Sequence, residues 1–458
     1  MRSRKAEIVR RVHALPTVSY DDDGRLTSFA GLVLFFALFR ALSLMTRLRR
    51  CFAHLGRGRV FGLARVVLQL VVHIILGFRR LRDRDYYAED PLICRLLGVS
   101  RLPDVGTISR TLCTADPRAV KNVRGLCRDL VLERLSLLRL PRLTFDFDGS
   151  VLSTARRAEG SAVGYNPKRK GARSYYPLFA LISQLGMFFD LLHRPGNTHD
   201  SRGATDFIGD CIARVREKLP RAVLEARLDS AFFNESVLGL LEQLRVEYAA
   251  AVPFTHYTTL RHLVDSRQRW IRIDDEWSYF ETSWRPKKWA SKRRIILVRR
   301  RQPVRRKGPL QLDLFEPVDH EFTYKAIVTT KTVSAATVLA FFNGRGIQEQ
   351  LFGEAKQHAA LGYIPCRRLI PNQVYVLSAM LAHNLSRELQ LRAGPEQRRT
   401  TPTRGGLFNV RSLGTLRDQL IRRAGALTRP GGRLALKIAA PAPAREEFDN
   451  LLDHLQAA

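Results

Sequence analysis

The sequence predicts an α/β protein that has a mixed β-sheet core, a helical N-terminal domain and a β-rich insertion. Residues 26–47, 60–78 and 118–138 repeat apolar side chains at helical spacing, so residues 1–140 are expected to form the helical domain. From Leu143 the pattern changes to a strict alternation of apolar and polar residues, which is typical of a strand. Strand and helix patterns then alternate, and this order favours parallel strands joined by helices.

The predicted core extends over residues 141–390. Strand patterns occupy 143–148, 175–183, 187–193, 224–229 and 246–252, and helical patterns lie at 202–217 and 234–244. The first three strands are close enough in sequence to form an antiparallel meander, whereas the last two are separated by helices and are expected to join in parallel. This mixed order is that of a ribonuclease-H-like fold.

A change in composition marks the insertion at about residues 254–332. All four tryptophans of the chain lie within twenty residues: Trp270, Trp277, Trp284 and Trp289. Residues 285–307 contain twelve Lys or Arg and no acidic residue. Residues 391–458 hold Pro/Gly-rich links and a short helix near 445–456, and we expect a C-terminal tail with a possible role in dimerisation.

The net charge of +33 over 458 residues makes nucleic acid the first partner to consider, although ribosomal and membrane-surface proteins share this sign. The six cysteines form no CxxC pair, which argues against a zinc ribbon or a disulfide framework. MRSRKAEIVRR at the start has no apolar signal region. The apolar run 29–39 is too short to span a bilayer, and the run 60–78 carries a polar stripe, so no membrane association is expected. The expected location is the cytoplasm, near the nucleoid.

Residues 92–112 predict two helices separated by a turn at Gly98, the second beginning near Thr107. Such a pair resembles a helix-turn-helix whose second helix enters the major groove of DNA. A helical hairpin that only contributes to the core has the same pattern, and both interpretations stay open.

Three carboxylates stand where the predicted topology could bring them together. Asp148 ends the first strand, Asp229 ends the fourth, and Glu349 lies on a later helix. The first and fourth strands are neighbours in this fold, and carboxylate oxygens suit Mg²⁺ or Mn²⁺. Two such ions about 4 Å apart support phosphodiester cleavage. Individually, Asp148 could begin a turn, Asp229 could cap a helix, and Glu349 could pair with a nearby arginine.

The segment FFNGRGIQEQLFGEAK, residues 341–356, predicts a helix with one functional face. Phe342, Arg345, Glu349 and Lys356 fall within about 40° of one line along it. This face could present the acid to a metal ion and the two cations to a phosphate, with Arg345 as the better bidentate clamp. Ordinary ion pairs on a solvated helix have the same spacing.

Several motifs resemble those of the DDE transposases of bacterial insertion sequences, and within them the insertion sequence thirteen-eighty family and transposase DDE domain group 1. They are LTFDFDGSVL, GYNPKRKGARSYYPLFA, LLHRPGNTHDSRGA, ARLDSAFF and FNGRGIQEQLFGEAK. The last resembles the Tyr-x2-Arg-x3-Glu-x6-Lys signature, with Phe342 in place of the tyrosine, so one hydroxyl is missing. The resemblance makes Asp148, Asp229 and Glu349 the catalytic acids and metal ligands. Asp146 is kept as an alternative ligand or a supporting residue.

The resemblance implies an enzyme that cleaves transposon ends and transfers the strands to target DNA by a two-metal, cut-and-paste mechanism. Its partners would be double-stranded DNA and a second copy of the chain in a synaptic dimer. Trp284 and Trp289, which flank Lys287 and Lys288, are expected to contact DNA through a flipped base, unless they belong to the core of the insertion. A non-catalytic DNA-binding remnant and a nuclease without strand transfer are the alternatives.

Overall fold

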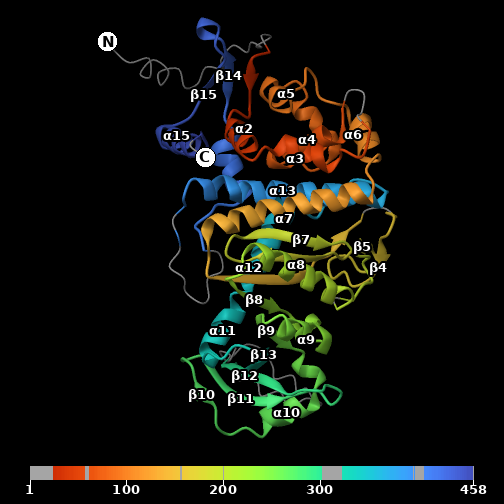
Figure 1. The fold of residues 1–458 in the computed structure, drawn as a ribbon, viewed down its shortest axis with the longest axis vertical. Helices are drawn as coiled ribbons and strands as arrows, with labels where there is room; N and C mark the ends of the chain where they lie inside the picture. Colours follow the sequence, from red (N-terminus) through yellow and green to blue (C-terminus); the bar gives the residue numbers. More distant parts are fainter. Residues whose placement is uncertain are drawn as a thin grey trace, which may run out of the picture.

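A computed structural model describes residues 24–56, 61–154, 157–199, 201–301, 322–395, 397 and 407–456. The N-terminal segment, the Arg305–Lys307 part of the basic run and most of the 394–406 link lie outside the described residues. The described chain is elongated, with a helical body at one end, a large sheet in the middle and the β-rich region at the other end (Figure 1).

The central sheet has nine strands in the order β10-β11-β12-β13-β9-β8-β2-β6-β7. Its core strands are β2 (Arg142–Gly149), β6 (Leu178–Ile182), β7 (Met187–Leu192), β8 (Val223–Leu228) and β9 (Glu247–Val252). β2, β6 and β7 pair antiparallel, whereas β8 pairs parallel with both β2 and β9. The predicted meander, the parallel additions and the contact between first and fourth strands are therefore confirmed, and the core is ribonuclease-H-like.

The β-rich region continues this same sheet. It contains β10 (Ile271–Arg272), β11 (Trp277–Trp284), β12 (Arg293–Arg301) and β13 (Phe322–Thr329), together with α10 (Thr258–Asp265). These four strands are antiparallel, and β13 pairs with β9 of the core. The sequence did not indicate β11, because tryptophan, glutamate and serine disturb its alternation.

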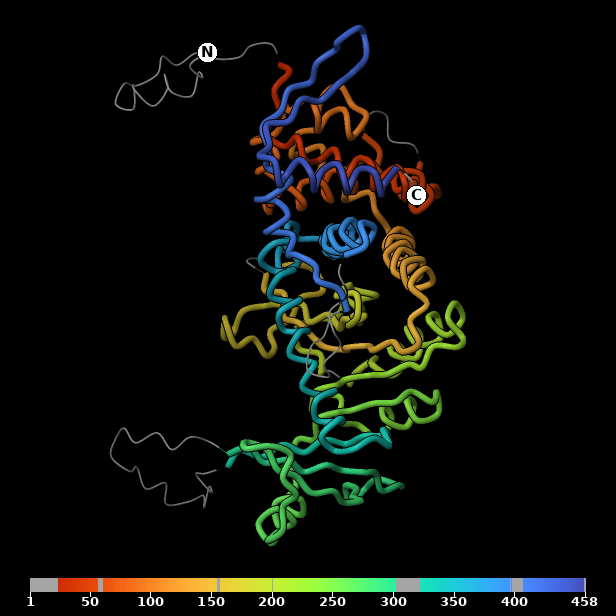
Figure 2. Tube along the Cα trace, turned by 90° about the vertical axis from the view of Figure 1, so that its left-hand side faces the viewer, coloured from red at the N-terminus to blue at the C-terminus, as the bar shows by residue number. Residues whose placement is uncertain are grey.

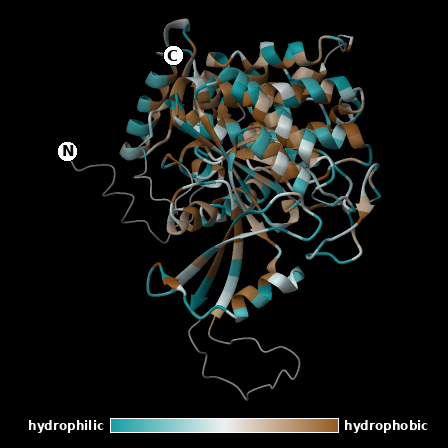
Figure 3. Cartoon of the chain, turned by 60° about the horizontal axis from the view of Figure 1, so that its bottom comes forward, coloured by the Kyte–Doolittle hydropathy of each residue, from teal (hydrophilic) through white to brown (hydrophobic). Residues whose placement is uncertain are grey.

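Helices cover the core sheet and form the body beyond it. α8 (Ala204–Lys218) and α9 (Glu235–Gln243) follow the core strands, and α7 (Pro117–Leu138) and α13 (Leu369–Arg392) lie side by side between the sheet and the helical body (Figure 1). The body contains α2 (Leu32–Ala41), α3 (Leu44–Cys51), α4 (Leu63–Ile75), α5 (Pro91–Leu97) and α6 (Val105–Leu112). Figure 3 shows hydrophilic (teal) and hydrophobic (brown) residues alternating along the helices of the chain.

The helix pair expected at 92–112 is present as α5 and α6. Gly98 ends α5 with a φ of 63°, a left-handed conformation that glycine adopts without strain. Asp104 caps α6 by accepting a hydrogen bond from the backbone N–H of Thr107. Ile108 and Leu112 of α6 are buried, whereas Arg110 is exposed, so one side of this helix packs and another faces solvent.

The two ends of the described chain meet in the helical body. β1 (Leu26–Thr27), β14 (Gly425–Thr428) and β15 (Ala435–Ile438) form a small antiparallel sheet, and α15 (Ala442–Gln456) packs on α2. Figure 2 shows the blue C-terminal segment against the red N-terminal helices, far from the green β-rich region. Residues 425–456 are thus part of the body, where we had expected a tail, whereas Phe408 packs in the hydrophobic core of the central sheet. No helix in the described parts of the chain combines the length and apolarity needed to cross a membrane.

Candidate active site

Asp148 and Asp229 lie at the ends of two neighbouring parallel strands. Asp148 is near the end of β2, and Asp229 follows β8 directly. Asp229 also caps the short helix 230–232 by accepting a hydrogen bond from the backbone N–H of Ala231 at 2.9 Å through Oδ1. The capping role foreseen for this residue is therefore real, but it uses one oxygen and leaves Oδ2 directed elsewhere.

Arg345 lies between these two aspartates. Its Nη2 atom is 3.3 Å from Oδ2 of Asp148 and 3.5 Å from Oδ2 of Asp229. The side chains of the three residues are 19–29% exposed, so solvent reaches the site. Two carboxylates that converge on one cationic group offer the hard oxygen donors that a divalent cation prefers, and in this respect the pair fits a metal site.

Glu349 is not brought together with the two aspartates. It is exposed in the first turn of α12 (Gly346–His358), and among the described residues no group of three or more acidic, His or Cys side chains is arranged to hold a metal ion. The buried face of α12 carries Gln348, Leu351, Phe352 and Ala355 instead. Glu349 nevertheless lies one turn after Arg345, which itself reaches both aspartates.

The single helix expected over 341–356 is interrupted. α11 (Ala335–Asn343) ends before Gly344, and α12 starts at Gly346, so Arg345 stands between two glycines at the junction. Both Gly344 and Arg345 keep right-handed helical dihedral angles. Phe342 lies before the interruption and packs against the hydrophobic cluster of β12, β13 and α11. Its ring is thus partly buried against protein side chains, away from the face that was expected to carry Phe342, Arg345, Glu349 and Lys356 together.

Lys356 is at the site. Its Nζ donates to the backbone carbonyl of Val151, three residues beyond Asp148, at 3.3 Å. Burial lowers the pKa of Lys356, and nearby Lys168 lowers it further, while Asp148 acts in the opposite direction. The charges of a carboxylate and of a second cation therefore both act on Lys356, and this cation, Lys168, was not among the residues predicted for the site.

Asp146 has a different environment from Asp148. It is fully buried, and Arg227 on β8 binds its two oxygens through Nε at 2.6 Å and Nη2 at 2.7 Å. Arg227 also donates from Nη1 to the backbone carbonyl of Phe341 at 3.2 Å. Since both carboxylate oxygens are bound by one guanidinium, Asp146 supports the site and connects β2 and β8 to the end of α11.

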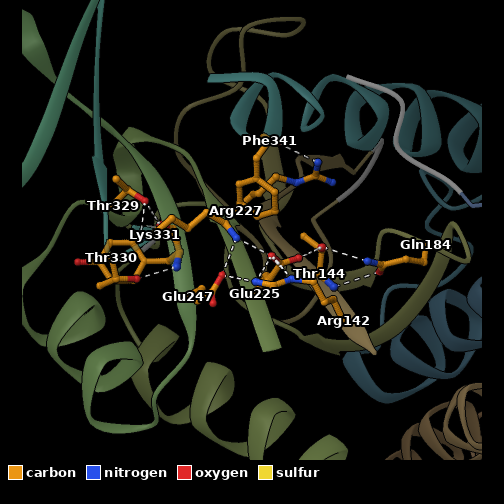
Figure 4. A network of polar contacts seen from close by, with 11 residues as sticks. Arg142, Thr144, Gln184, Glu225, Arg227, Glu247, Thr329, Thr330, Lys331 and Phe341 are labelled. Atoms are coloured by element: carbon orange, nitrogen blue, oxygen red, sulfur yellow. Dashed lines mark hydrogen bonds and ion pairs between the residues drawn. The ribbon is translucent and has the colours of Figure 1, made fainter. Parts of the chain in front are cut away.

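A buried ionic network lies at the opposite ends of the same strands (Figure 4). Nζ of Lys331 donates to Glu225 at 2.5 Å and to Glu247 at 2.8 Å, and Glu225 also accepts from Arg142 and Thr144. Lys331 lies over the ring of Phe341 at 4.3 Å. This network joins β2, β8 and β9 to the segment that follows β13, and it holds the β-rich region on the core.

The tryptophans expected to contact DNA are packed on protein. Trp289 stacks on Phe233 with ring centroids 4.6 Å apart and an interplanar angle of 27°. Trp284 packs edge-on against Tyr257 at 5.0 Å, and its indole N–H donates to Thr259. Trp270 and Trp277 also pack against hydrophobic clusters. Both Trp284 and Trp289 stay partly exposed, and the adjacent Lys287 and Lys288 are exposed.

Two residues of this region were not predicted from the sequence. Lys168 lies in GYNPKRKGARSYY, which drew attention as a motif without any assigned side chain. Arg227 lies two residues before Asp229, as Asp146 lies two before Asp148, and side chains at this spacing share one face of a strand. That matched spacing on neighbouring strands was the available signal for the buried pair.

Residues 11–458 match the family model described as Transposase DDE domain group 1. The match covers nearly the whole sequence, so the chain belongs to this family and is a DDE transposase. Enzymes of this class act in DNA transposition by phosphodiester hydrolysis and transesterification and use divalent metal ions. No curated protein matches the chain by sequence.

Several solved transposase structures are similar to the chain. The piggyBac transposase synaptic complex with hairpin DNA has 10% identity and a TM-score of 0.42, over 86% of this chain and 79% of that one. The Mos1 transposase paired-end complex with the left transposon end has 11% identity and a TM-score of 0.18, over 40% and 57%. The Mos1 mariner paired-end complex with Mn has 13% identity and a TM-score of 0.17, over 50% and 78%.

Proposed function

We propose that Asp148, Asp229 and Glu349 are the catalytic acids with which this transposase cleaves the ends of its element. The convergence of Asp148 and Asp229 on one guanidinium is the observation that carries the assignment. Glu349 takes its place from the family signature and from its position one turn after Arg345. Since α12 begins at a glycine-flanked junction, this junction is the hinge at which α12 would rotate to bring Glu349 to the aspartates.

The three acids would hold two Mg²⁺ or Mn²⁺ ions, which supply Lewis-acid stabilisation of the reacting phosphate and an activated nucleophile. Arg345 then exchanges its two carboxylates for the phosphate, to which a guanidinium can donate two parallel hydrogen bonds. Lys356 provides a second positive charge beside the same strand. Glu349 and Lys356 on α12, and Arg345 at the junction before it, would thus act on a phosphate held over the ends of β2 and β8.

DNA is the proposed partner over a wider surface. The exposed Lys287 and Lys288 and the other cations of the β-rich region would neutralise phosphates, and α6 would approach the terminal inverted repeat. Synapsis by two copies of the chain, location in the cytoplasm near the nucleoid and membership of the insertion sequence thirteen-eighty branch are parts of the same proposal. Trp284 and Trp289 would contact DNA only through the parts of their rings that remain exposed.

Separate Asp229→Ala and Glu349→Gln variants test the assignment. Each is expected to abolish Mg²⁺-dependent cleavage of a DNA fragment that carries the element's end, while the binding of that fragment is retained. Cleavage at the wild-type rate by either variant would remove that residue from the catalytic set. Glu354→Gln is a matched control on the same helix, because Glu354 pairs with Arg387 away from the two aspartates.

Two further outcomes distinguish the alternative functions. A wild-type protein that binds end DNA but never nicks it in Mg²⁺ would be a non-catalytic remnant, consistent with Phe342 in place of tyrosine. A protein that nicks but does not join a pre-cut 3′ end to a target plasmid would be a nuclease without strand transfer.

A further inference from the structure

A cationic hairpin projects beside the candidate active site. β4 (Ala162–Val163) and β5 (Arg173–Tyr175) pair antiparallel, and residues 164–172 connect them. The loop exposes Lys168, Arg169 and Lys170, with no acidic residue between them. Tyr165 is 80% exposed, the highest value among the large hydrophobic side chains exposed in the described part of the chain. An aromatic ring next to three cations is a surface that suits single-stranded nucleic acid.

This loop is held in a defined shape from beneath. The Asn166 side chain is buried; it donates to Ser153 Oγ at 2.9 Å and accepts from the backbone N–H of Arg169 at 3.1 Å. At the base of the loop, Gly164 packs so closely on the backbone that a Cβ there would lie 1.9 Å from the carbonyl oxygen of Gly196. The exposed side chains are therefore presented by an anchored backbone, which lowers the entropy lost on binding.

The hairpin reaches the catalytic helix as well. Its strand β5 pairs with β3 (Leu152–Ser153), which follows Asp148 within a few residues. Lys168 is near enough to Lys356 for its charge to act on that amine. Nζ of Lys356 donates to the backbone carbonyl of Val151, the residue before β3, and Asn166 of the loop donates to Ser153 on β3, so this strand joins the hairpin to α12. A phosphate held between the hairpin and α12 would be attracted by cations on both.

We propose that the 164–172 hairpin binds a single-stranded DNA segment next to the scissile phosphate, with Tyr165 stacked on an unpaired base and Lys168, Arg169 and Lys170 on the adjacent phosphates. The inference rests on the proposed function, because it takes the ends of β2 and β8 as the site of cleavage. It adds a second point of contact for the strand, on an element outside the catalytic signature.

The stacking contact is tested by fluorescence anisotropy in EDTA, so that binding is measured without cleavage. The probes are a duplex of about 20 base pairs with a single-stranded extension of about five nucleotides, and the same duplex with blunt ends. Tyr165→Ala is expected to weaken binding of the extended probe by about fivefold or more and to leave the blunt probe unchanged, while Tyr165→Phe retains wild-type binding. Tyr86→Ala is the control, since Tyr86 is 77% exposed in the helical body.

The phosphate contacts are tested by salt dependence on the extended probe. Replacing Lys168, Arg169 and Lys170 together by alanine should make the slope of log K against log salt shallower by about two, since each single-strand contact contributes about 0.7. The matched control replaces Arg429, Arg433 and Lys437, which are exposed near β14 and β15 and carry the same total charge. It should change the slope by less than half as much.

The proposal is overturned if Tyr165→Ala binds both probes as the wild type does, or if both triple variants change the slope equally. Failure of the proposed function would be seen in a different experiment, as a wild-type protein that does not cleave end DNA in Mg²⁺. The two results are independent because the hairpin measurements need no metal ion.

Discussion

Removing one partner of the buried Asp146–Arg227 pair should destabilise the protein strongly. Asp146 is fully buried and Arg227 is 4% exposed, so neither charge can be hydrated in the folded state. Arg227→Met removes both hydrogen bonds to the carboxylate and the hydrogen bond to the carbonyl of Phe341. A buried charge left without its partner costs about 3–5 kcal/mol, and we expect a loss of this size in the free energy of unfolding.

The double variant Asp146→Leu with Arg227→Met should recover most of that loss, because it replaces the pair by apolar groups of similar size. Urea unfolding followed by tryptophan fluorescence measures both, since Trp270, Trp284 and Trp289 pack against the sheet's hydrophobic core. Both variants lose the hydrogen bond from Arg227 to the carbonyl of Phe341, which helps to position the segment leading to Arg345, four residues later. The double variant should therefore still cleave DNA more slowly than the wild type.

The control is Arg272→Met. Arg272 pairs with Asp275 on the surface, where the two side chains are 73% and 90% exposed, and such pairs contribute less than about 1 kcal/mol. If Arg227→Met cost no more than this control, the buried pair would not connect the strands as described. If the double variant were as unstable as the single one, lost packing rather than the unpaired carboxylate would be the cause.

Three further predictions concern single residues. Arg345→Ala should abolish most end cleavage but change the free energy of unfolding by less than about 1 kcal/mol, because its ion pairs are partly solvated; normal cleavage would contradict its phosphate role. Burial raises the pKa of Glu225, but the hydrogen bond and the charge of Lys331 outweigh this effect, so the pKa is lowered overall. The stability that this carboxylate contributes is therefore present above about pH 4.3, the ordinary pKa of a glutamate, and should be lost as the pH is decreased below that value. Glu225→Gln should lack this component in urea titrations between pH 3 and 6, whereas an identical pH profile would contradict the linkage. Trp289→Ala should cost about 1–2 kcal/mol through loss of its stacking on Phe233, and an unchanged unfolding curve would show that the ring is free for DNA.

The sequence was sufficient for the core sheet because its signals are local. Strict alternation from Leu143 predicts the first strand, and a glycine before Met187 predicts the turn that leads into β7. Helical spacing predicts the helices that lie between the later strands. In the ribonuclease-H-like fold that this order of elements predicts, the first and fourth strands are neighbours, and the meeting of Asp148 and Asp229 follows from that placement.

The features that were not predicted depend on contacts between distant segments. β14 and β15 are four residues each and pair with each other, and the third strand of their sheet, β1, lies about 400 positions earlier in the chain. The position of Arg345 between two aspartates depends on how its two flanking glycines end one helix and start the next. A helical projection assumes a regular helix, and for this reason it aligned Phe342 with Glu349 although their surroundings differ.

The pairing of β1 with β14 has a consequence for synthesis of the protein. During translation, β1 and α2 emerge from the ribosome long before β14, which pairs with β1, and α15, which packs on α2, are made. The helical body must wait for the last tenth of the chain before its apolar surface is covered, so a nascent chain halted near residue 420 is expected to be a target for chaperones and proteases. A premature stop codon in that region would therefore reduce the cellular level of the protein, even though every candidate catalytic residue precedes it.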